Sequence, residues 1–371
     1  AGAGLVPRVG PARAAGVEVT PAPPGQKIRI GRRNARAGET EDFLATLVRA
    51  NRAIDDAARG KADASCADVL PKDLGEWAAT VEFVLGPSAT GKDLRDLSVL
   101  DQFYAQEHTA AIACRQGLGA LVAQLAEGIP VALSTPVTRI AWSNRDVAVE
   151  TASGRIAARA AIVTVSSNVL TSGRLPFAPE LPKRQLDAAS KLSLGSYDRI
   201  ALQLPPNALG LGRDEVVIEQ STTTRTALLY ANIGGSSLCT VDVAGSFGRD
   251  LAAQGEAAMI AFAHEWLGSL YGSEAVAKVQ RSVATRWNAA PFALGAMSAA
   301  APGGQPSRKI LAEPFGNVYL AGEATHETWP GTVDGAWESG ERAADAVLKK
   351  LGPAKPEPAA KPGKKKRSKK S

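Results

Sequence analysis

The spacing of hydrophobic residues changes along this chain and predicts a helical region followed by a region of strands. Between residues 39 and 126 the apolar positions recur at helical spacing, as in the stripe formed by Phe43, Leu44, Leu47 and Val48. From residue 129 to residue 165 the apolar residues alternate or form short runs, which is typical of strands. These strands are expected at residues 131–133, 137–142, 147–151 and 161–165, with a hairpin turn at Ser153-Gly154.

The second half of the chain continues this mixture of helices and strands. We expect helices at residues 181–191 and 252–268, and strands at residues 196–204, 215–219, 225–231, 237–243 and 279–287. A last apolar strand ends at Ala321, and a helix opens at Gly331 and runs to Val347. The chain of 371 residues is long enough for two domains with hydrophobic cores.

The composition is that of a soluble globular protein, with 45% apolar and 22% charged residues. No apolar run approaches the roughly 18 residues of a membrane-spanning helix. We therefore expect a soluble protein, cytoplasmic or periplasmic, whose compartment the sequence leaves open. The three cysteines form no paired framework and the three histidines are not spaced as ligands, so we expect no metal site.

The positive net charge comes from the C-terminal tail. Residues 352–371 hold eight Lys or Arg residues and one Glu, so the remainder of the chain is close to neutral. This Pro-, Ala- and Lys-rich segment is expected to be disordered because it cannot bury a core. It either touches acidic surfaces weakly or only improves solubility, and we expect no specific nucleic-acid partner.

The segment from Val318 to Ala336 carries the clearest chemical signal. A short apolar strand is followed by Gly322 and Glu323, then a loop, then Gly331 at the start of a helix. A strand–loop–helix junction directs free backbone N–H groups and the positive end of a helix dipole at one point. This point suits an anionic or electron-rich edge of a ligand.

The same segment closely resembles the C-terminal signature of the flavin-containing amine oxidases, the family of monoamine oxidases, polyamine oxidases and flavin histone lysine demethylases. In that family the strand reads roughly VYFAGE and the helix opens YPGTVxGA. Three further stretches resemble family motifs, namely Ser134 to Ile140, Gly154 to Val165 and Trp287 to Ala296. The resemblance covers residues 115–350 and implies an α/β two-domain fold with a Rossmann-type FAD domain and a substrate domain of mixed sheet and helices.

The resemblance also implies domain boundaries and an incomplete FAD domain. Parts of the FAD domain are expected at residues 112–170 and 310–351, and the substrate domain at residues 1–111 and 171–309. Strands 161–165 and 318–321 should then be neighbours in one sheet. The start Gly2-Ala3-Gly4 meets Pro7 instead of a third glycine, so we interpret the chain as N-terminally truncated, with a degenerate Rossmann start as the alternative. Without this unit the chain should bind FAD poorly.

Cofactor contacts are implied by the resemblance at seven positions. The backbone of Val137 would contact the adenine, and Glu323 would contact the ribityl or phosphate oxygens. The backbone of Thr332 and Val333 would donate to the pyrimidine edge of the flavin, although a simple helix cap at Thr332 is compatible with this. Trp287 would pack against the flavin or belong to the core. The glycines of the junction, Gly322 and Gly331, complete this set.

Two residues are candidates for the substrate side. Trp329 lies where relatives place an aromatic residue facing flavin or substrate, or it is part of the core. Arg199 lies where many relatives have a lysine that holds a water near the flavin. It would replace this lysine, bind a substrate carboxylate, or form a salt bridge with Asp198 or another neighbour. His326 is interpreted as a loop residue more readily than as a base.

The implied activity is oxidation of an amine to an imine, with FAD as cofactor and molecular oxygen reduced to hydrogen peroxide. The imine would hydrolyse to an aldehyde or keto product. The substrate would be a small amine or an amino acid, so an amino-acid oxidase or a tryptophan 2-monooxygenase-like reaction is an alternative. A chain that has kept the fold without catalysis is the second alternative.

Overall fold

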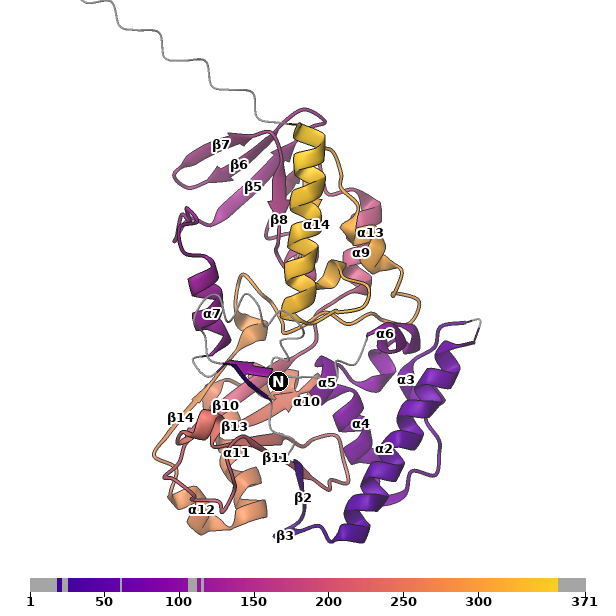
Figure 1. The fold of residues 1–371 in the computed structure, drawn as a ribbon, viewed down its shortest axis with the longest axis vertical. Coiled ribbons are helices and arrows are strands. Elements are labelled where there is room, and N and C mark those ends of the chain that lie inside the picture. The colour runs from indigo at the N-terminus through magenta and orange to yellow at the C-terminus, as the bar shows by residue number, and fades with distance from the viewer. Residues whose placement is uncertain (1–18, 22–25, 61, 106–111, 115–116, 353–371) are drawn as a thin grey trace, which may run out of the picture.

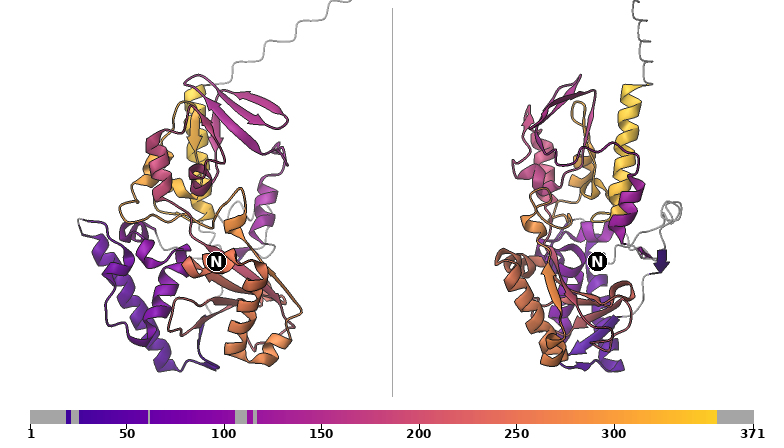
Figure 2. Two further views of the ribbon diagram at one scale, coloured as in Figure 1. Left: turned by 180° about the vertical axis from the view of Figure 1, so that it is seen from behind. Right: turned by 90° about the vertical axis from the view of Figure 1, so that its left-hand side faces the viewer.

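The computed structural model describes residues 19–21, 26–60, 62–105, 112–114 and 117–352, and these form a lower and an upper part (Figure 1, Figure 2). The expected disorder of the tail and the N-terminal Gly2-Ala3-Gly4 turn lie outside the described residues. Between the two parts lie the helix α7 (Leu118–Leu125) and a small antiparallel pair formed by β1 (Val19–Pro21) and β4 (Ile112–Cys114).

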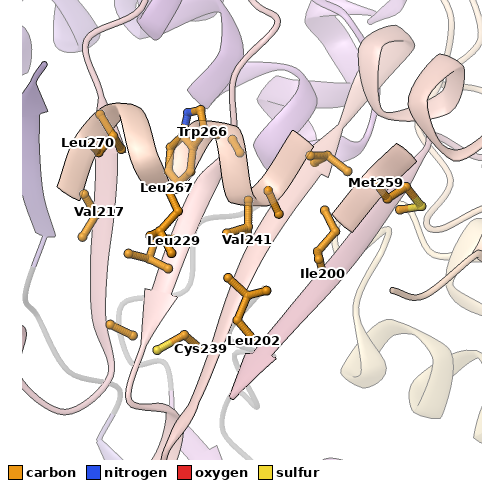
Figure 3. Close-up of a cluster of buried hydrophobic side chains, with 14 of the residues drawn as sticks. Ile200, Leu202, Val217, Leu229, Cys239, Val241, Met259, Trp266, Leu267 and Leu270 are labelled. Carbon is orange, nitrogen blue, oxygen red and sulfur yellow. The ribbon is translucent and has the colours of Figure 1, made fainter. Parts of the chain in front are cut away.

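The lower part is built on a seven-stranded sheet. Its strands in spatial order are β14 (Arg281–Ala284), β10 (Tyr197–Gln203), β13 (Leu238–Ala244), β12 (Leu228–Ala231), β11 (Glu215–Glu219), β2 (Gln26–Ile30) and β3 (Arg33–Asn34). All neighbouring pairs are antiparallel except β11 and β2. One face of the sheet packs against α11 (Glu256–Tyr271), whose neighbours are α10 (Gly245–Ala253) and α12 (Ser273–Ala277). Figure 3 shows this core, in which Trp266 and Leu267 of the helix lie on strand residues such as Leu229 and Val241.

A group of helices, one long and several short, packs beside the other face of this sheet. It consists of α2 (Ala37–Ala58), α3 (Cys66–Val69), α4 (Ala78–Leu85), α5 (Pro87–Thr90) and α6 (Val99–Tyr104), with the 3₁₀ turns η1 (Gly75–Trp77) and η2 (Leu94–Asp96). Its core contains Phe43 and Ile54 of α2 together with Ile218 and Leu228 of the sheet. In β11, Val217 points into the first core and Ile218 into the second, because successive strand residues face opposite sides.

The upper part contains two small sheets. One combines β5 (Val137–Trp142), β6 (Val147–Thr151), β7 (Gly154–Ala158) and β9 (Phe177–Ala178). The other is a parallel pair of β8 (Ala161–Val163) and β15 (Val318–Leu320), flanked by α13 (Ser307–Ala312) and α14 (Val333–Leu351). The helices α8 (Ser167–Thr171) and α9 (Lys183–Lys191) complete this part. The predicted pairing of residues 161–165 with residues 318–321 is therefore confirmed.

Three expectations from the sequence are wrong in detail. Residues 131–133 do not form a strand, because they lie in a surface turn in which Leu133 is exposed and Ser134 has a φ of 52°. The helix expected at 252–268 is two helices, because Gly255, with a φ of 100°, interrupts it. The region 39–126 is not entirely helical, since it includes β4.

No described helix combines the length and apolar character that a bilayer crossing needs.

Candidate functional site

The junction between β15 and α14 has the strand–loop–helix geometry expected from the sequence. Thr332 is the N-cap of α14, and its hydroxyl accepts a hydrogen bond from the Gly335 amide at 2.9 Å. The same hydroxyl donates to the Trp329 carbonyl at 2.8 Å. A Cβ at Gly335 would lie 2.1 Å from this carbonyl, so only glycine allows the loop to pass so close to the helix. The loop is thereby held against the first turn of α14.

The amide of Val333, at the first position of this helix, donates to no acceptor among the described residues. The Thr332 side chain satisfies the Gly335 amide and the Thr332 carbonyl accepts from Ala336. An N–H group in the first turn of a 19-residue helix adds to the positive end of the helix dipole. This end of α14 can therefore receive an electron-rich edge of a ligand.

Glu323 fixes the loop that precedes α14. One carboxylate oxygen accepts from the Ser298 amide at 3.1 Å. The other accepts from the Ser298 hydroxyl at 2.7 Å and from the Gly331 amide at 2.6 Å. Both oxygens are therefore engaged within the chain, and Glu323 joins the loop to the segment that contains Ser298. Gly322 provides the turn before it, with a φ of 135°.

His326 and Trp329 stabilise the same loop. Their rings are stacked with centroids 5.4 Å apart and planes within 7°. His326 Nδ1 accepts hydrogen bonds from the amides of Thr328 and Trp329, so the ring proton is on Nε2, which faces a carboxylate oxygen of Glu338 at 3.2 Å. This arrangement agrees with a loop-stabilising role for His326.

A cavity of about 620 Å³ lies beside this loop and reaches the helices of the lower part. The described residues that line it are Asn51, Ile54, Asp55, Leu85, Ala89, Thr90, Asp101, Gln102, Phe103, Ala105, Met297, Ser298, Ala299, Pro330, Gly331 and Thr332. Its volume is within the range of small-molecule sites in proteins. Two residues predicted from the sequence, Gly331 and Thr332, therefore border a space that can hold a ligand.

One residue of the cavity wall, Asp101, forms a buried ion pair. Arg308 of α13 is fully buried and contacts Asp101 of α6, with Nε to Oδ1 at 2.6 Å and a second hydrogen bond at 2.8 Å. The guanidinium also donates to the Ser298 hydroxyl at 3.0 Å and to the Ala324 carbonyl at 3.3 Å. Asp101 is thus connected through Arg308 and Ser298 to Glu323. No sequence motif marks Arg308, Asp101 or Ser298.

Trp287 and Val137 both lie on the surface. Trp287 begins the 3₁₀ turn η4 (Trp287–Ala289) and is 48% exposed, so it is not a core residue. Its amide donates to the buried Asp198 carboxylate at 2.9 Å, and Thr285 donates to the same oxygen at 2.8 Å. Burial raises the pKa of Asp198, against the lowering effect of these hydrogen bonds. Val137 is 39% exposed at the start of β5.

Arg199 forms an ion pair, and its partner is Asp242 rather than Asp198. Nε of Arg199 lies 3.3 Å from the Asp242 carboxylate on the neighbouring strand β13. Asp198 faces the opposite side of the sheet because successive strand residues alternate. The Tyr197 hydroxyl donates to Asp242 at 2.7 Å, and burial raises the pKa of Tyr197 well above its usual value of 10. Arg199 is not among the described residues that line the cavity.

The described residues of this site include no metal centre, and two of them, Arg308 and Asp101, belong to no local sequence motif. Within the described part of the chain, no group of three or more His, Cys, Asp or Glu side chains could hold a metal ion. Arg308 and Asp101 are separated by 207 positions and belong to no local motif. Their pairing could not be found without knowing how the chain folds.

Comparison with known proteins identifies a matching family model and several relatives in sequence. A sequence model described as "Flavin containing amine oxidoreductase" matches residues 36–348. Lysine-specific histone demethylase 2 of Homo sapiens is 28% identical over 70% of this chain and 33% of its own length. Lysine-specific histone demethylase 1 homolog 3 of Oryza sativa subsp. japonica is 30% identical over 62% of this chain and 30% of its own length. The chain therefore spans about a third of these relatives.

Solved structures with the same fold cover nearly all of the chain. Cyclohexylamine oxidase from Brevibacterium oxydans IH-35A superposes with a TM-score of 0.73 at 18% identity, covering 92% of this chain and 85% of that structure. Wild-type putrescine oxidase bound to putrescine gives a TM-score of 0.75 at 17% identity with the same coverage. The expected α/β amine oxidase fold is thereby confirmed.

Proposed function

Because this chain belongs to the flavin-containing amine oxidoreductase family, we propose that it contributes the flavin-ring and substrate sites of an FAD-dependent amine oxidase. The observation that carries this proposal is the cavity of about 620 Å³ bordered by Gly331 and Thr332 at the positive end of α14. A cofactor edge and a substrate could meet at this point. The Asp198 carboxylate positions Trp287 through a backbone hydrogen bond of 2.9 Å.

The residues at the junction fit a flavin ring. The Val333 amide has no acceptor in the described chain and begins a helix whose dipole favours negative charge. FAD, when bound, would supply the two-electron oxidation, and negative charge on its pyrimidine edge would be stabilised by this amide. Val137 would contact the adenine end, since it lies at the start of β5 and is 39% exposed. Glu323 would act mainly by holding Gly331 in place.

The proposed reaction removes two electrons and two protons from the carbon–nitrogen bond of an amine. Written for a primary amine, RCH2NH2, O2 and H2O give RCHO, NH3 and H2O2. The carbon is oxidised, molecular oxygen is reduced, and water adds to the imine to release ammonia. The cavity walls would orient the amine, and the apolar residues Leu85 and Phe103 are among those that line it.

The test combines flavin binding with product detection. The purified chain is titrated with FAD and followed by flavin fluorescence, and hydrogen peroxide is measured by a peroxidase-coupled assay after addition of an alkylamine in excess FAD. We expect amine-dependent hydrogen peroxide release above that of FAD alone. No release with a range of primary and secondary amines would contradict the proposed activity.

One substitution isolates the Val333 amide. Proline at the first position of a helix keeps the helical geometry and removes only the N–H group. Thr332 is already extended, with φ of −115° and ψ of 155°, as the residue before a proline must be. We expect Val333→Pro to weaken binding of oxidised FAD about two- to tenfold, the effect of one lost hydrogen bond to a neutral acceptor. Val333→Ala, which keeps the amide, should bind FAD as wild type does.

A further inference from the structure

The charge of the cavity points to the kind of amine that it accepts. Among its described lining residues are two carboxylates, Asp55 and Asp101, and no Lys, Arg or His. Asp101 is already neutralised by the buried Arg308 and also accepts the Ala300 amide at 2.8 Å. The negative charge that remains for a ligand is therefore that of Asp55.

Asp55 has no partner within the described part of the chain. Its carboxylate takes part in no hydrogen bond or ion pair there. Arg59, four positions further along the chain, pairs instead with Asp56 at 2.7 Å. Asp55 is only partly exposed, and it lies with Asn51 and Ile54 on one stripe of α2, at spacings of three and four residues. This stripe lines the cavity.

The rest of the wall suits a flexible carbon chain. Ile54, Leu85 and Phe103 are apolar, and Met297 lies in contact distance of Gly331 on the side of the loop. The cavity therefore offers an acidic group on α2, apolar walls, and the loop before α14 where the oxidation is proposed. An amine whose only amino group lies at the loop leaves the Asp55 carboxylate unpaired, whereas a second ammonium group at the other end of the carbon chain would pair with it.

We propose that Asp55 is a specificity-determining residue that binds the second ammonium group of a diamine or polyamine whose other amino group is oxidised beside residues 330–332. This inference rests on the proposed function of the same site. It also selects between the substrates that the sequence left open, because an amino-acid carboxylate would meet Asp55 without a cation among the described lining residues. A charge-assisted hydrogen bond of this kind changes affinity by roughly ten- to a hundredfold.

The experiment measures binding without turnover. Isothermal titration calorimetry of the purified chain without FAD compares 1,6-diaminohexane with 1,6-hexanediol, which have equal carbon chains but differ in charge, because the diol has no ammonium group. We expect the diamine to bind at least tenfold more tightly to wild type. Asp55→Asn should abolish this difference and leave binding of the uncharged diol unchanged, whereas Asp55→Glu should restore part of it.

Asp56→Asn is the matched control, because Asp56 is the next residue on α2 but is exposed and paired with Arg59. It should keep the diamine preference. Equal binding of the diamine and the diol to wild type, no measurable diamine binding, or an unchanged preference in Asp55→Asn would each overturn the inference. Failure of the proposed function would be seen separately, as a retained diamine preference with no hydrogen peroxide released in excess FAD.

Discussion

Lys92 shows how the environment of a single residue controls the pH dependence of stability. Its side chain is 6% exposed, and Nζ donates to the Ser193 hydroxyl at 2.9 Å and to the Ala299 carbonyl at 2.7 Å. Burial lowers the pKa of Lys92 from 10.5 to about 8, because the charged form loses hydration. Between these two pH values the unfolded chain binds a proton that the folded chain does not.

We therefore expect the folded state to gain stability as the pH rises through this window. Relative to Lys92→Met, the free energy of unfolding of wild type should increase by roughly 2 kcal/mol between pH 8 and pH 10. Urea denaturation of both proteins at these two pH values measures the change. Lys183→Met, which alters an exposed lysine on α9, should follow wild type. A flat difference between wild type and Lys92→Met would mean that Lys92 titrates normally.

The residues predicted from the sequence and those missed differ in how local their contacts are. Glu323, Gly331 and Thr332 lie within ten positions and form one motif, so the sequence located them together. Arg308 contacts Asp101 across 207 positions. Asp55 is a candidate ligand-binding residue only because distant segments of the chain form a cavity beside it. Arg199 was placed on a strand, but its partner Asp242 depends on the register between β10 and β13.

At the scale of elements, the hydrogen bonds at the N-terminus of α14 predict how substitutions there change the stability of the fold. The Thr332 hydroxyl caps the helix through Gly335 and also binds the Trp329 carbonyl. Thr332→Ala removes both hydrogen bonds, so we expect a loss of about 1 kcal/mol in the free energy of unfolding. Thr332→Ser keeps the hydroxyl and should lose only a few tenths. Chemical denaturation measures both, and equal losses in the two variants would assign the effect to the Thr332 methyl group.

The elements that the sequence predicted well are those with a strong local pattern. The strands at 137–142, 147–151 and 215–219 alternate or carry β-branched residues, and they are present at these positions. Residues 131–133 have a strand-like composition but no neighbouring strand to pair with, so they form a turn. The periodicity of hydrophobic residues does not show which strands are neighbours. The parallel pairing of β11 with β2, for example, depends on the fold of the whole chain.

At the scale of the whole molecule, residues 298–300 join the lower and upper parts. Ala299 belongs to the core around α2 and α4, whereas Ala300 belongs to the core around α9 and α13. The lower part holds this segment through Lys92, which binds the Ala299 carbonyl, and through the Ser98 amide, which binds the Ala300 carbonyl at 2.9 Å. The cavity lies at the same boundary, so the relative position of the two parts determines its shape.

Arg308 should control whether the two parts unfold together. It connects α13 of the upper part to α6 of the lower part, and its loss leaves the Asp101 charge buried without its partner. We expect Arg308→Met to lower the free energy of unfolding by about 3–5 kcal/mol. Arg49→Met, which breaks the exposed pair with Asp73, should cost less than about 1 kcal/mol.

Hydrogen exchange measured by peptide mass spectrometry at increasing urea would resolve the two parts. In wild type, we expect peptides from α2 and from β15 to lose protection at the same urea concentration, because the ion pair couples their cores. In Arg308→Met they should separate, since residues 298–300 no longer have the guanidinium that links Ser298 and Ala324 to Asp101. A variant that is destabilised but still loses protection in both peptides together would show that the remaining contacts of residues 298–300 are sufficient to couple the two parts.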